Sequence, residues 1–173
     1  MMRRYTNTLA NATESCYIRN MKSNPHTKRP PRICPFQDMR PFYFITFNTA
    51  DRAKILDTST VHEAFLSFCR TAYDNYGIAV GCYVIMPDHI HFFVVMPPET
   101  DLPRWIATLK MFLGKHIEKK PAWQRGFFDH LMRNRESYSQ KWDYVRENPV
   151  RAGLCQTSEQ WIFQGEFIPL MFD

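Results

Sequence analysis

The sequence lacks any apolar run of the roughly 18 residues that a membrane-spanning helix requires. Its first residues are polar after Arg3 and Arg4, without the apolar core of a signal peptide, so we expect a protein that is not secreted. The five cysteines are odd in number, widely spaced and without a CxxC pair. Such cysteines argue against a disulfide framework or a zinc finger, and they favour reduced thiols in a cytoplasmic protein. Internal repeats and low-complexity tracts are absent as well.

Positive charge is unevenly distributed along the chain. The net charge is +5, yet residues 1–40 alone carry eight Lys or Arg against two acidic residues, a net charge of +6. The remainder carries 14 basic against 15 acidic residues, a net charge of −1. We therefore divide the 173 residues into a basic, weakly ordered arm, residues 1–39, and a single folded domain, residues 40–173. Arms of this kind often bind nucleic acid, although a solvated leader without a binding role has the same composition.

Hydrophobic patterning predicts both strands and helices in the folded domain. Strands are expected where aromatic and β-branched residues run together, and helices where apolar residues repeat every three or four positions. The predicted strands are 41–47, 78–86 and 89–96, and the predicted helices are 58–76, 101–119 and 135–147. A short additional strand is expected within 123–130, and the tail 155–173 is expected to pack without regular structure.

The order of these elements indicates the fold class. Pro87-Asp88 separates two strands by a short turn, which predicts an antiparallel hairpin. The order strand, helix, strand, strand, helix, short strand and helix is typical of an α+β protein. We predict a ferredoxin-like antiparallel sheet with helices packed on one face.

Two histidines, His89 and His91, lie on the third predicted strand. Because alternate residues of a strand face the same side, both imidazoles should project together, while Ile90 points to the opposite face. Two imidazoles placed in this way can share a metal ion. A pair of structural histidines with hydrogen-bond partners would show the same short pattern, so the motif alone leaves both interpretations open.

Tyr144 lies on the last predicted helix, and Asn148 follows that helix directly, four positions after Tyr144. This spacing places the two side chains on one helix face, where the amide oxygen of Asn148 could bind a hard cation. A core tyrosine and an asparagine that ends the helix before Pro149 are the structural alternative. Tyr138 is a rival nucleophile, but the residue four positions after it is Trp142, which cannot bind a metal.

Together, the two patterns predict a phosphoryl-transfer site. Two imidazoles and an amide oxygen would hold a divalent ion, which stabilises charge on a phosphoryl group under in-line attack. A tyrosine hydroxyl would attack phosphorus and form a covalent intermediate. The phenoxide of tyrosine, whose ordinary pKa is about 10, is a better leaving group than a sugar alkoxide. The linkage would therefore be reversible, as strand transfer requires.

Three segments, in order along the chain, resemble one known family. They are residues 84–91 (VIMPDHIH), 126–130 (GFFDH) and 144–154 (YVRENPVRAGL). Over roughly residues 40–165 the chain is similar to the REP-associated tyrosine transposases, which belong to the single-tyrosine HUH transposases, also called transposase IS200-like proteins. Asp88 stands where many members have Asn.

The resemblance implies an HUH transposase fold and a DNA nickase and strand transferase. It implies Mg or Mn held by His89 and His91, with Asn148 as the third ligand, and a 5′-phosphotyrosine link at Tyr144. The implied partner is single-stranded DNA with hairpins of the repetitive extragenic palindrome (REP) type. We expect no membrane partner and a monomer rather than a dimer. The candidate DNA contacts are Lys28, Arg29, Arg32, Arg40, Lys110, Lys115, Arg133, Arg146 and Arg151.

Some functional questions remain open at this point. Asp129 and His130 match the family, but the sequence assigns them no role. A catalytically silent hairpin-binding protein and a metal-dependent phosphoesterase that uses water are the alternative functions. The intact pair of histidines together with Tyr144 argues against the first alternative. A covalent protein–DNA adduct would separate the predicted transposase from both.

Overall fold

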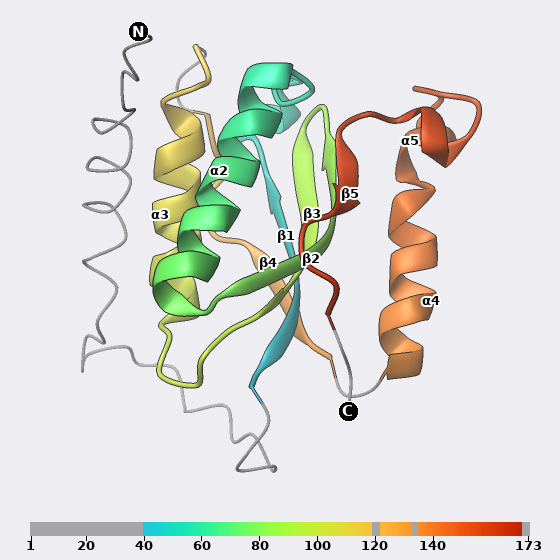
Figure 1. Cartoon of the computed structure of the whole chain (residues 1–173). Helices are drawn as coiled ribbons and strands as arrows, with labels where there is room; N and C mark the ends of the chain where they lie inside the picture. The colour runs from blue at the N-terminus through green and yellow to red at the C-terminus, as the bar shows by residue number, and fades with distance from the viewer. Residues whose placement is uncertain (1–39, 119–121, 133–134, 171–173) are drawn as a thin grey trace, which may run out of the picture.

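The computed structural model describes residues 40–118, 122–132 and 135–170, and the basic arm lies outside this part. Five strands form one sheet in the order β4-β1-β3-β2-β5, and every neighbouring pair is antiparallel (Figure 1). The strands are β1 (Phe42–Asn48), β2 (Ala79–Met86), β3 (His89–Val95), β4 (Phe128–Leu131) and β5 (Gln164–Glu166). The helices are α2 (Ser59–Tyr76), α3 (Leu102–Gly114), α4 (Arg135–Arg146) and α5 (Asn148–Arg151), with short 3-10 helices at η2 (Ala50–Arg52) and η3 (Ser158–Gln160). The first four strands have the ferredoxin-like order, which confirms the predicted α+β fold.

The predicted hairpin is the central feature of the sheet. Pro87 and Asp88 form the turn between β2 and β3, and Met86 pairs with His89 directly beside it. On its other edge, β3 pairs with β1, so that His89 lies opposite Asn48. The N-terminal end of β3 therefore lies between two strands that can support the side chains it presents.

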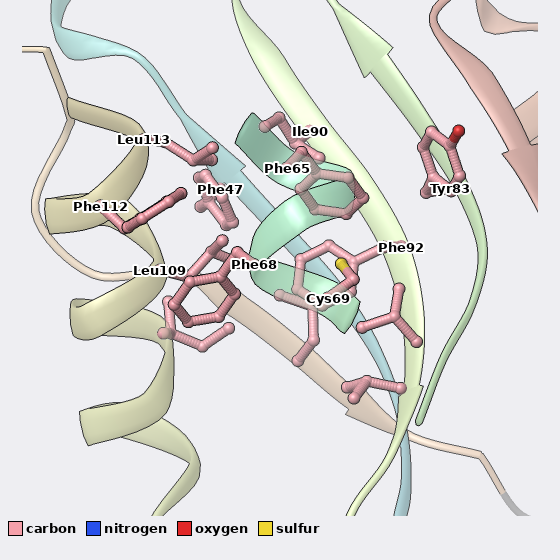
Figure 2. Packing of buried hydrophobic residues seen from close by; sticks show 14 of the residues in the cluster. Phe47, Phe65, Phe68, Cys69, Tyr83, Ile90, Phe92, Leu109, Phe112 and Leu113 are labelled. Carbon is pink, nitrogen blue, oxygen red and sulfur yellow. The ribbon is translucent and has the colours of Figure 1, made fainter. Parts of the chain in front are cut away.

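The larger hydrophobic core fills the space between the sheet and the helices α2 and α3. Helix α2 follows the N-cap Thr58 and is ended by Gly77, whose φ of 63° is the left-handed conformation that glycine adopts most readily. Aromatic side chains of α2 and α3 pack on Phe47 and Phe92 from the sheet, as Figure 2 shows. Each fully buried side chain of this size contributes roughly 1.5–3 kcal/mol, so this face holds the sheet rigid.

Helix α4 packs on the opposite face of the sheet, so the prediction that helices cover one face is wrong (Figure 1). A second, smaller core there contains Val145 of α4 together with Phe44 and Phe93 of the sheet. The period-2 pattern of the strands is the reason: Phe44 and Phe93 point away from the larger core and need a cover of their own. Helix α4 supplies that cover and brings Tyr144 over the sheet.

Two predicted boundaries also differ from the structure. Helix α3 ends at Gly114, five residues before the predicted end at residue 119. Ile117 is buried, but it lies in the segment after the helix rather than on the helix itself. The tail was expected to be irregular, but its residues Gln164–Glu166 form the edge strand β5 beside β2. Aromatic residues of the tail pack against both cores, which explains why no simple period was visible in its sequence.

No helix in the described part of the chain is long and apolar enough to cross a membrane. Of the five cysteines, the structure describes Cys69, Cys82 and Cys155, and all three are free thiols.

Candidate active site

His89 and His91 project from the face of β3 that α4 covers. Their neighbours Ile90 and Phe92 lie in the larger core on the other face, as strand alternation predicted. The two imidazole rings are close, with centroids 4.6 Å apart and planes at 83° to each other. Both rings line the same pocket, which is the arrangement that a shared metal ion requires.

The Nδ1 atom of each imidazole is already engaged. Nδ1 of His89 donates to the Asp88 carboxylate at 2.6 Å, since a carboxylate can only accept. Nδ1 of His91 lies 2.7 Å from the hydroxyl of Thr46, which can donate or accept. These contacts leave the Nε2 atom of each ring as the nitrogen available to a ligand. Metal-binding histidines are commonly oriented by a partner on their other nitrogen.

Burial keeps both imidazoles neutral. Burial, together with the nearby imidazole of His89, lowers the pKa of His91 to about 3. Burial also lowers the pKa of His89, although hydrogen bonding to Asp88 opposes this effect. Only a neutral imidazole has a lone pair for a metal, so protonation does not compete with metal binding near neutral pH.

Tyr144 and Asn148 line the same pocket as the two histidines. Tyr144 lies in the last turn of α4, and its side chain is 65% exposed. The predicted helix does not continue to Asn148, because the chain breaks its regular geometry at Glu147 and Asn148 begins the short helix α5. Pro149 lies in the first turn of α5, a position where its missing N–H is tolerated. Tyr144 and Asn148 are thus brought together by a helix–helix junction rather than by one helix face.

Arg151 of α5 holds this junction together. Its guanidinium lies 4.0 Å from the centre of the Tyr144 ring, within the range of a cation–π contact. The same group donates to the backbone oxygen of Tyr144 at 2.5 Å and to Oδ1 of Asn148. Arg151 therefore contacts both the proposed nucleophile and the proposed third metal ligand.

The pocket shared by these residues has a volume of about 480 Å³. Its other cation is Lys141 of α4, whose ammonium lies 4.7 Å from the centre of the Phe44 ring. Phe44 in turn stacks on His91, with ring centroids 5.6 Å apart.

Among the described residues that line the pocket, none is a carboxylate. The residues are Phe44, Met86, His89, His91, Lys141, Tyr144, Val145, Asn148, Arg151 and Ala152. A hollow with two cations and no anion suits a negatively charged ligand such as a phosphodiester.

Tyr138, the rival nucleophile, is placed differently. Its hydroxyl donates to the sulfur of Cys82 at 3.1 Å, and its ring packs against Phe42 and Phe93 in the smaller core. Burial raises its pKa far above that of a free tyrosine. Tyr138 does not line the pocket, so its position favours a structural role.

Comparison with known proteins identifies the family. The sequence model of the family described as transposase IS200-like matches residues 41–148, well over half of the chain. The chain belongs to this family. Its members are transposases and therefore enzymes, and the predicted resemblance to REP-associated tyrosine transposases is confirmed.

Individual relatives support the same assignment. A REP-associated tyrosine transposase of Escherichia coli K12 is 27% identical over 123 residues, which span 70% of this chain and 73% of the relative. A Haemophilus influenzae protein named for the same family is 28% identical over 134 residues, covering 69% of this chain and 76% of the relative. A solved structure of a REP-associated tyrosine transposase bound to a REP hairpin superimposes with a TM-score of 0.63 at 22% identity. That match covers 80% of this chain and 81% of the other, and it supports the fold.

Of the candidate DNA contacts that the structure describes, only Arg151 lines the pocket of this transposase. Arg146 points to the other flank of α4, where it pairs with Glu159 at 2.7 Å. Lys110 lies on α3, across the sheet, and its ammonium donates to the backbone oxygens of Gln124 and Gly126. These two contacts make Lys110 part of the packing between α3 and the following loop.

The remaining candidates lie away from the pocket or outside the described residues. Lys115 is exposed at the C-cap of α3. Arg40 donates to the backbone oxygen of Gly77, and it precedes the end of β1 that lies opposite Val95, far along the sheet from His89. Lys28, Arg29, Arg32 and Arg133 fall outside the described residues.

Asp129 and His130 lie on the edge strand β4. Asp129 pairs with Ile45 and His130 with Phe44, so His130 belongs to the face that α4 covers. His130 is exposed and is not among the residues that line the pocket. Asp129 belongs to the opposite face, with Ile45, so the two residues do not act together at the pocket, and the structure assigns them no function.

The side chains of this transposase fit a divalent metal ion when Asn148 is included. In residues 40–118, 122–132 and 135–170, His, Cys, Asp and Glu form no group of three or more that could hold a metal. His89 and His91 supply two neutral nitrogens, and the Asn148 amide supplies an oxygen in the same pocket. Three such ligands leave positions open for a substrate, as catalytic metal sites do.

Sequence reasoning missed several residues of the site. Lys141 lies three positions before Tyr144 on the same helix, so helical spacing alone could have identified it. Thr46 and Arg52 could not have been found in this way, because they come from β1 and η2, and only the strand register brings them to β3.

Proposed function

We propose that this transposase cleaves and rejoins single-stranded DNA through a 5′-phosphotyrosine intermediate at Tyr144. The observation that carries the proposal is the pocket itself, which joins Tyr144 to the paired imidazoles of His89 and His91. Lys141 and Arg151 add positive charge to the same pocket. A tyrosine nucleophile, a pair of metal ligands and a cationic surface together match transfer of a phosphodiester.

His89, His91 and Asn148 would hold Mg or Mn in this pocket. A bound divalent ion polarises a phosphoryl oxygen and stabilises the charge that develops during displacement. Asp88 and Thr46 orient the two imidazoles through Nδ1, so the Nε2 atoms remain directed at the pocket.

The chain's own residues then account for the covalent step. The hydroxyl oxygen of Tyr144 attacks phosphorus, the bond to the 3′ oxygen breaks, and the DNA is left with a free 3′-hydroxyl and a 5′-phosphotyrosine. The contact of Arg151 with the Tyr144 ring restricts the ring to the pocket mouth, which lowers the entropy lost on attack. Because Tyr144 is 65% exposed, a DNA strand can reach it without opening the core.

Hairpin DNA of the REP type is the proposed substrate. A solved structure with the same fold contains a REP-associated tyrosine transposase bound to a REP hairpin. An unpaired strand next to a hairpin can enter a pocket of this size at a lower cost than a duplex can. We expect a monomer to suffice, since the whole proposed catalytic set comes from one chain. The cytoplasm remains the expected compartment for a protein with DNA as its substrate and reduced thiols.

The decisive experiment is to incubate the protein with labelled single-stranded hairpins and Mn, and to look for a covalent adduct that survives denaturing electrophoresis. Tyr144→Phe should abolish the adduct but leave hairpin binding intact. Tyr138→Phe is the matched control, and it should form the adduct because the Tyr138 hydroxyl donates to Cys82 and Tyr138 does not line the pocket. An adduct at wild-type yield in Tyr144→Phe would refute the nucleophile.

The same assay tests the metal and the alternatives. His89→Ala, His91→Ala and excess chelator should each abolish the adduct. Hairpin binding without any cleavage would indicate a silent binding protein. Cleavage without an adduct would indicate a phosphoesterase that uses water. Equal cleavage of a fully paired duplex would contradict the single-stranded substrate.

A further inference from the structure

The reaction proposed above creates a leaving group that needs a proton. When the bond from the Tyr144 oxygen to phosphorus forms, the bond from phosphorus to the 3′ oxygen breaks. An alkoxide is a poor leaving group, so a general acid that protonates the 3′ oxygen would accelerate this step. This inference rests on the proposed function, and it concerns which side chain supplies that proton.

The chemistry of the pocket leaves few candidates among the described residues that line it. His89 and His91 are half-buried and neutral, and their Nδ1 atoms face Asp88 and Thr46 rather than the pocket. Arg151 keeps its proton under all ordinary conditions, because a guanidinium cannot be deprotonated in a protein. Tyr144 is the nucleophile. Lys141 is the remaining side chain with a proton to donate.

Lys141 lines the same pocket as Tyr144, His89 and His91. It sits three residues before Tyr144 on α4, so their side chains are neighbours on the helix surface. Its ammonium lies 4.7 Å above Phe44, and Phe44 stacks on His91. In the part of the chain that the structure describes, no carboxylate forms an ion pair with Lys141. Its charge is therefore available to a substrate in the pocket that holds the nucleophile and the imidazole pair.

We propose that Lys141 is the general acid of strand cleavage. Its ammonium gives a proton to the 3′ oxygen as that oxygen leaves, and the hydroxyl proton of Tyr144 passes to water. In the reverse step the neutral amine of Lys141 takes the proton from an attacking 3′-hydroxyl, and the Tyr144 phenoxide leaves and is protonated by water. One lysine thus serves both cleavage and rejoining, and its protonation state is restored after a complete cycle.

A sulfur substitution in the substrate tests this role directly. After the cleavage position has been mapped with the wild-type protein, the 3′ bridging oxygen at that position is replaced by sulfur. A thiolate leaves without protonation, so the sulfur substrate does not need a general acid. Lys141→Met should slow adduct formation on the oxygen substrate by about 10²–10⁴-fold. On the sulfur substrate the rate of adduct formation in the same variant should fall less than about 10-fold, because this substrate does not need the general acid that the variant lacks.

Two further variants separate the acid from a simple positive charge. Lys141→Arg keeps the charge but cannot give up its proton readily, so it should bind the hairpin normally and still fail on the oxygen substrate. Arg125→Met removes an exposed cation that does not line the pocket and should match the wild type on both substrates. Thermal melting of each variant checks that the fold is retained.

The outcomes distinguish this inference from the proposed function. Equal losses on both substrates would assign Lys141 to binding or charge stabilisation and overturn the general acid. Wild-type rates in Lys141→Met on the oxygen substrate would overturn it as well, while the transposase mechanism would stand. If the wild-type protein formed no adduct with either substrate, the proposed function and this inference would both fail.

Discussion

The carboxylate of Asp88 accepts a hydrogen bond from Nδ1 of His89 at 2.6 Å, and its second oxygen lies 2.8 Å from Nε of Arg52. Arg52 is held in turn by Oδ1 of Asn48 at 2.7 Å. Arg52 has a φ of 53°, a left-handed conformation that costs a residue other than glycine about 1–3 kcal/mol. We infer that this backbone conformation is tolerated because it directs Arg52 at Asp88, which fixes the ring of His89.

Removal of the Asp88 carboxylate should weaken metal binding. Without an acceptor at Nδ1, the imidazole of His89 can rotate and can adopt the tautomer that places a proton on Nε2. Asp88→Ala should therefore raise the dissociation constant for Mn by about 10–100-fold, as loss of such supporting groups commonly does. Asp88→Asn should have a smaller effect, since its amide oxygen can still accept from Nδ1. Titration calorimetry with Mn measures both values without any DNA.

The control for this prediction is Asp74→Ala, which removes an exposed carboxylate from α2. It should bind Mn as the wild type does. An NMR spectrum of the metal-free protein labelled with ¹⁵N at histidine gives a second reading, because the two imidazole tautomers have distinct nitrogen shifts. If His89 showed the same tautomer in Asp88→Ala as in the wild type, Asp88 would not be the group that selects it.

Acid should destabilise the metal-free protein through His91. Burial lowers the pKa of His91 to about 3 in the folded state, whereas in an unfolded chain it is about 6.5. Between these values the unfolded chain binds more protons, so stability falls as pH falls through this window and is fully present above it. For one titrating group, the free energy of unfolding changes by at most about 1.4 kcal/mol per pH unit.

Thermal melting in chelator from pH 7.5 to pH 5 measures this effect. His91→Gln cannot take up the proton, so its melting temperature should fall less than that of the wild type over the same interval. His116→Gln removes an exposed histidine and should follow the wild type. Parallel curves for His91→Gln and the wild type would show that His91 titrates normally in the folded protein.

Loss of Arg151 should slow cleavage without weakening metal binding. Arg151 restrains the Tyr144 ring and also donates to Oδ1 of Asn148. A misplaced nucleophile can cost up to about 100-fold in rate, so Arg151→Met should reduce the rate of adduct formation at saturating DNA. The same variant should bind Mn at least as tightly as the wild type, because a positive charge beside the proposed ligand has been removed.

Asn148→Ala should show the reverse pattern. It should raise the Mn concentration that cleavage requires, but by less than His89→Ala does.

Arg125→Met serves as the matched control, since Arg125 is exposed in the loop before β4. Arg151→Lys should remain impaired, because lysine lacks the planar group that packs on the ring and donates to two acceptors. If Arg151→Met lost hairpin affinity but kept its rate at saturation, Arg151 would be a DNA contact rather than a positioning residue.

Local patterns in the sequence explain how much could be predicted. The alternation around His89 and His91 predicted which face of β3 they occupy, because the side-chain period of a strand is fixed by its backbone. Thr58 and Gly77 cap the two ends of α2, and the predicted helix 58–76 agrees with the observed helix to within one residue at each end. These signals depend only on neighbouring residues, and they are therefore visible in one sequence.

The parts that could not be predicted depend on distant segments. That Tyr144 would reach the histidines required α4 to cross to the second face of the sheet, and no short-range signal specifies that path. Strand β5 forms because β2 offers a free edge, so its three residues needed no period of their own. The break at Glu147 was hidden because Tyr144 and Asn148 show helical spacing whether or not one helix joins them.

The basic arm should contribute affinity but not chemistry. Residues 1–40 carry a net charge of +6 and the remainder −1, so most of the excess positive charge lies in the arm. A chain that starts at Met39 keeps Arg40 but loses every earlier basic residue. Each phosphate contact adds about −0.7 to the slope of log affinity against log salt on single strands, so this chain should show a shallower slope and weaker hairpin binding. Its cleavage of saturating DNA should stay near wild type, because His89, His91 and Tyr144 remain. An unchanged slope would identify the arm as a leader without DNA contacts, and loss of cleavage at saturation would show that it shapes the active site.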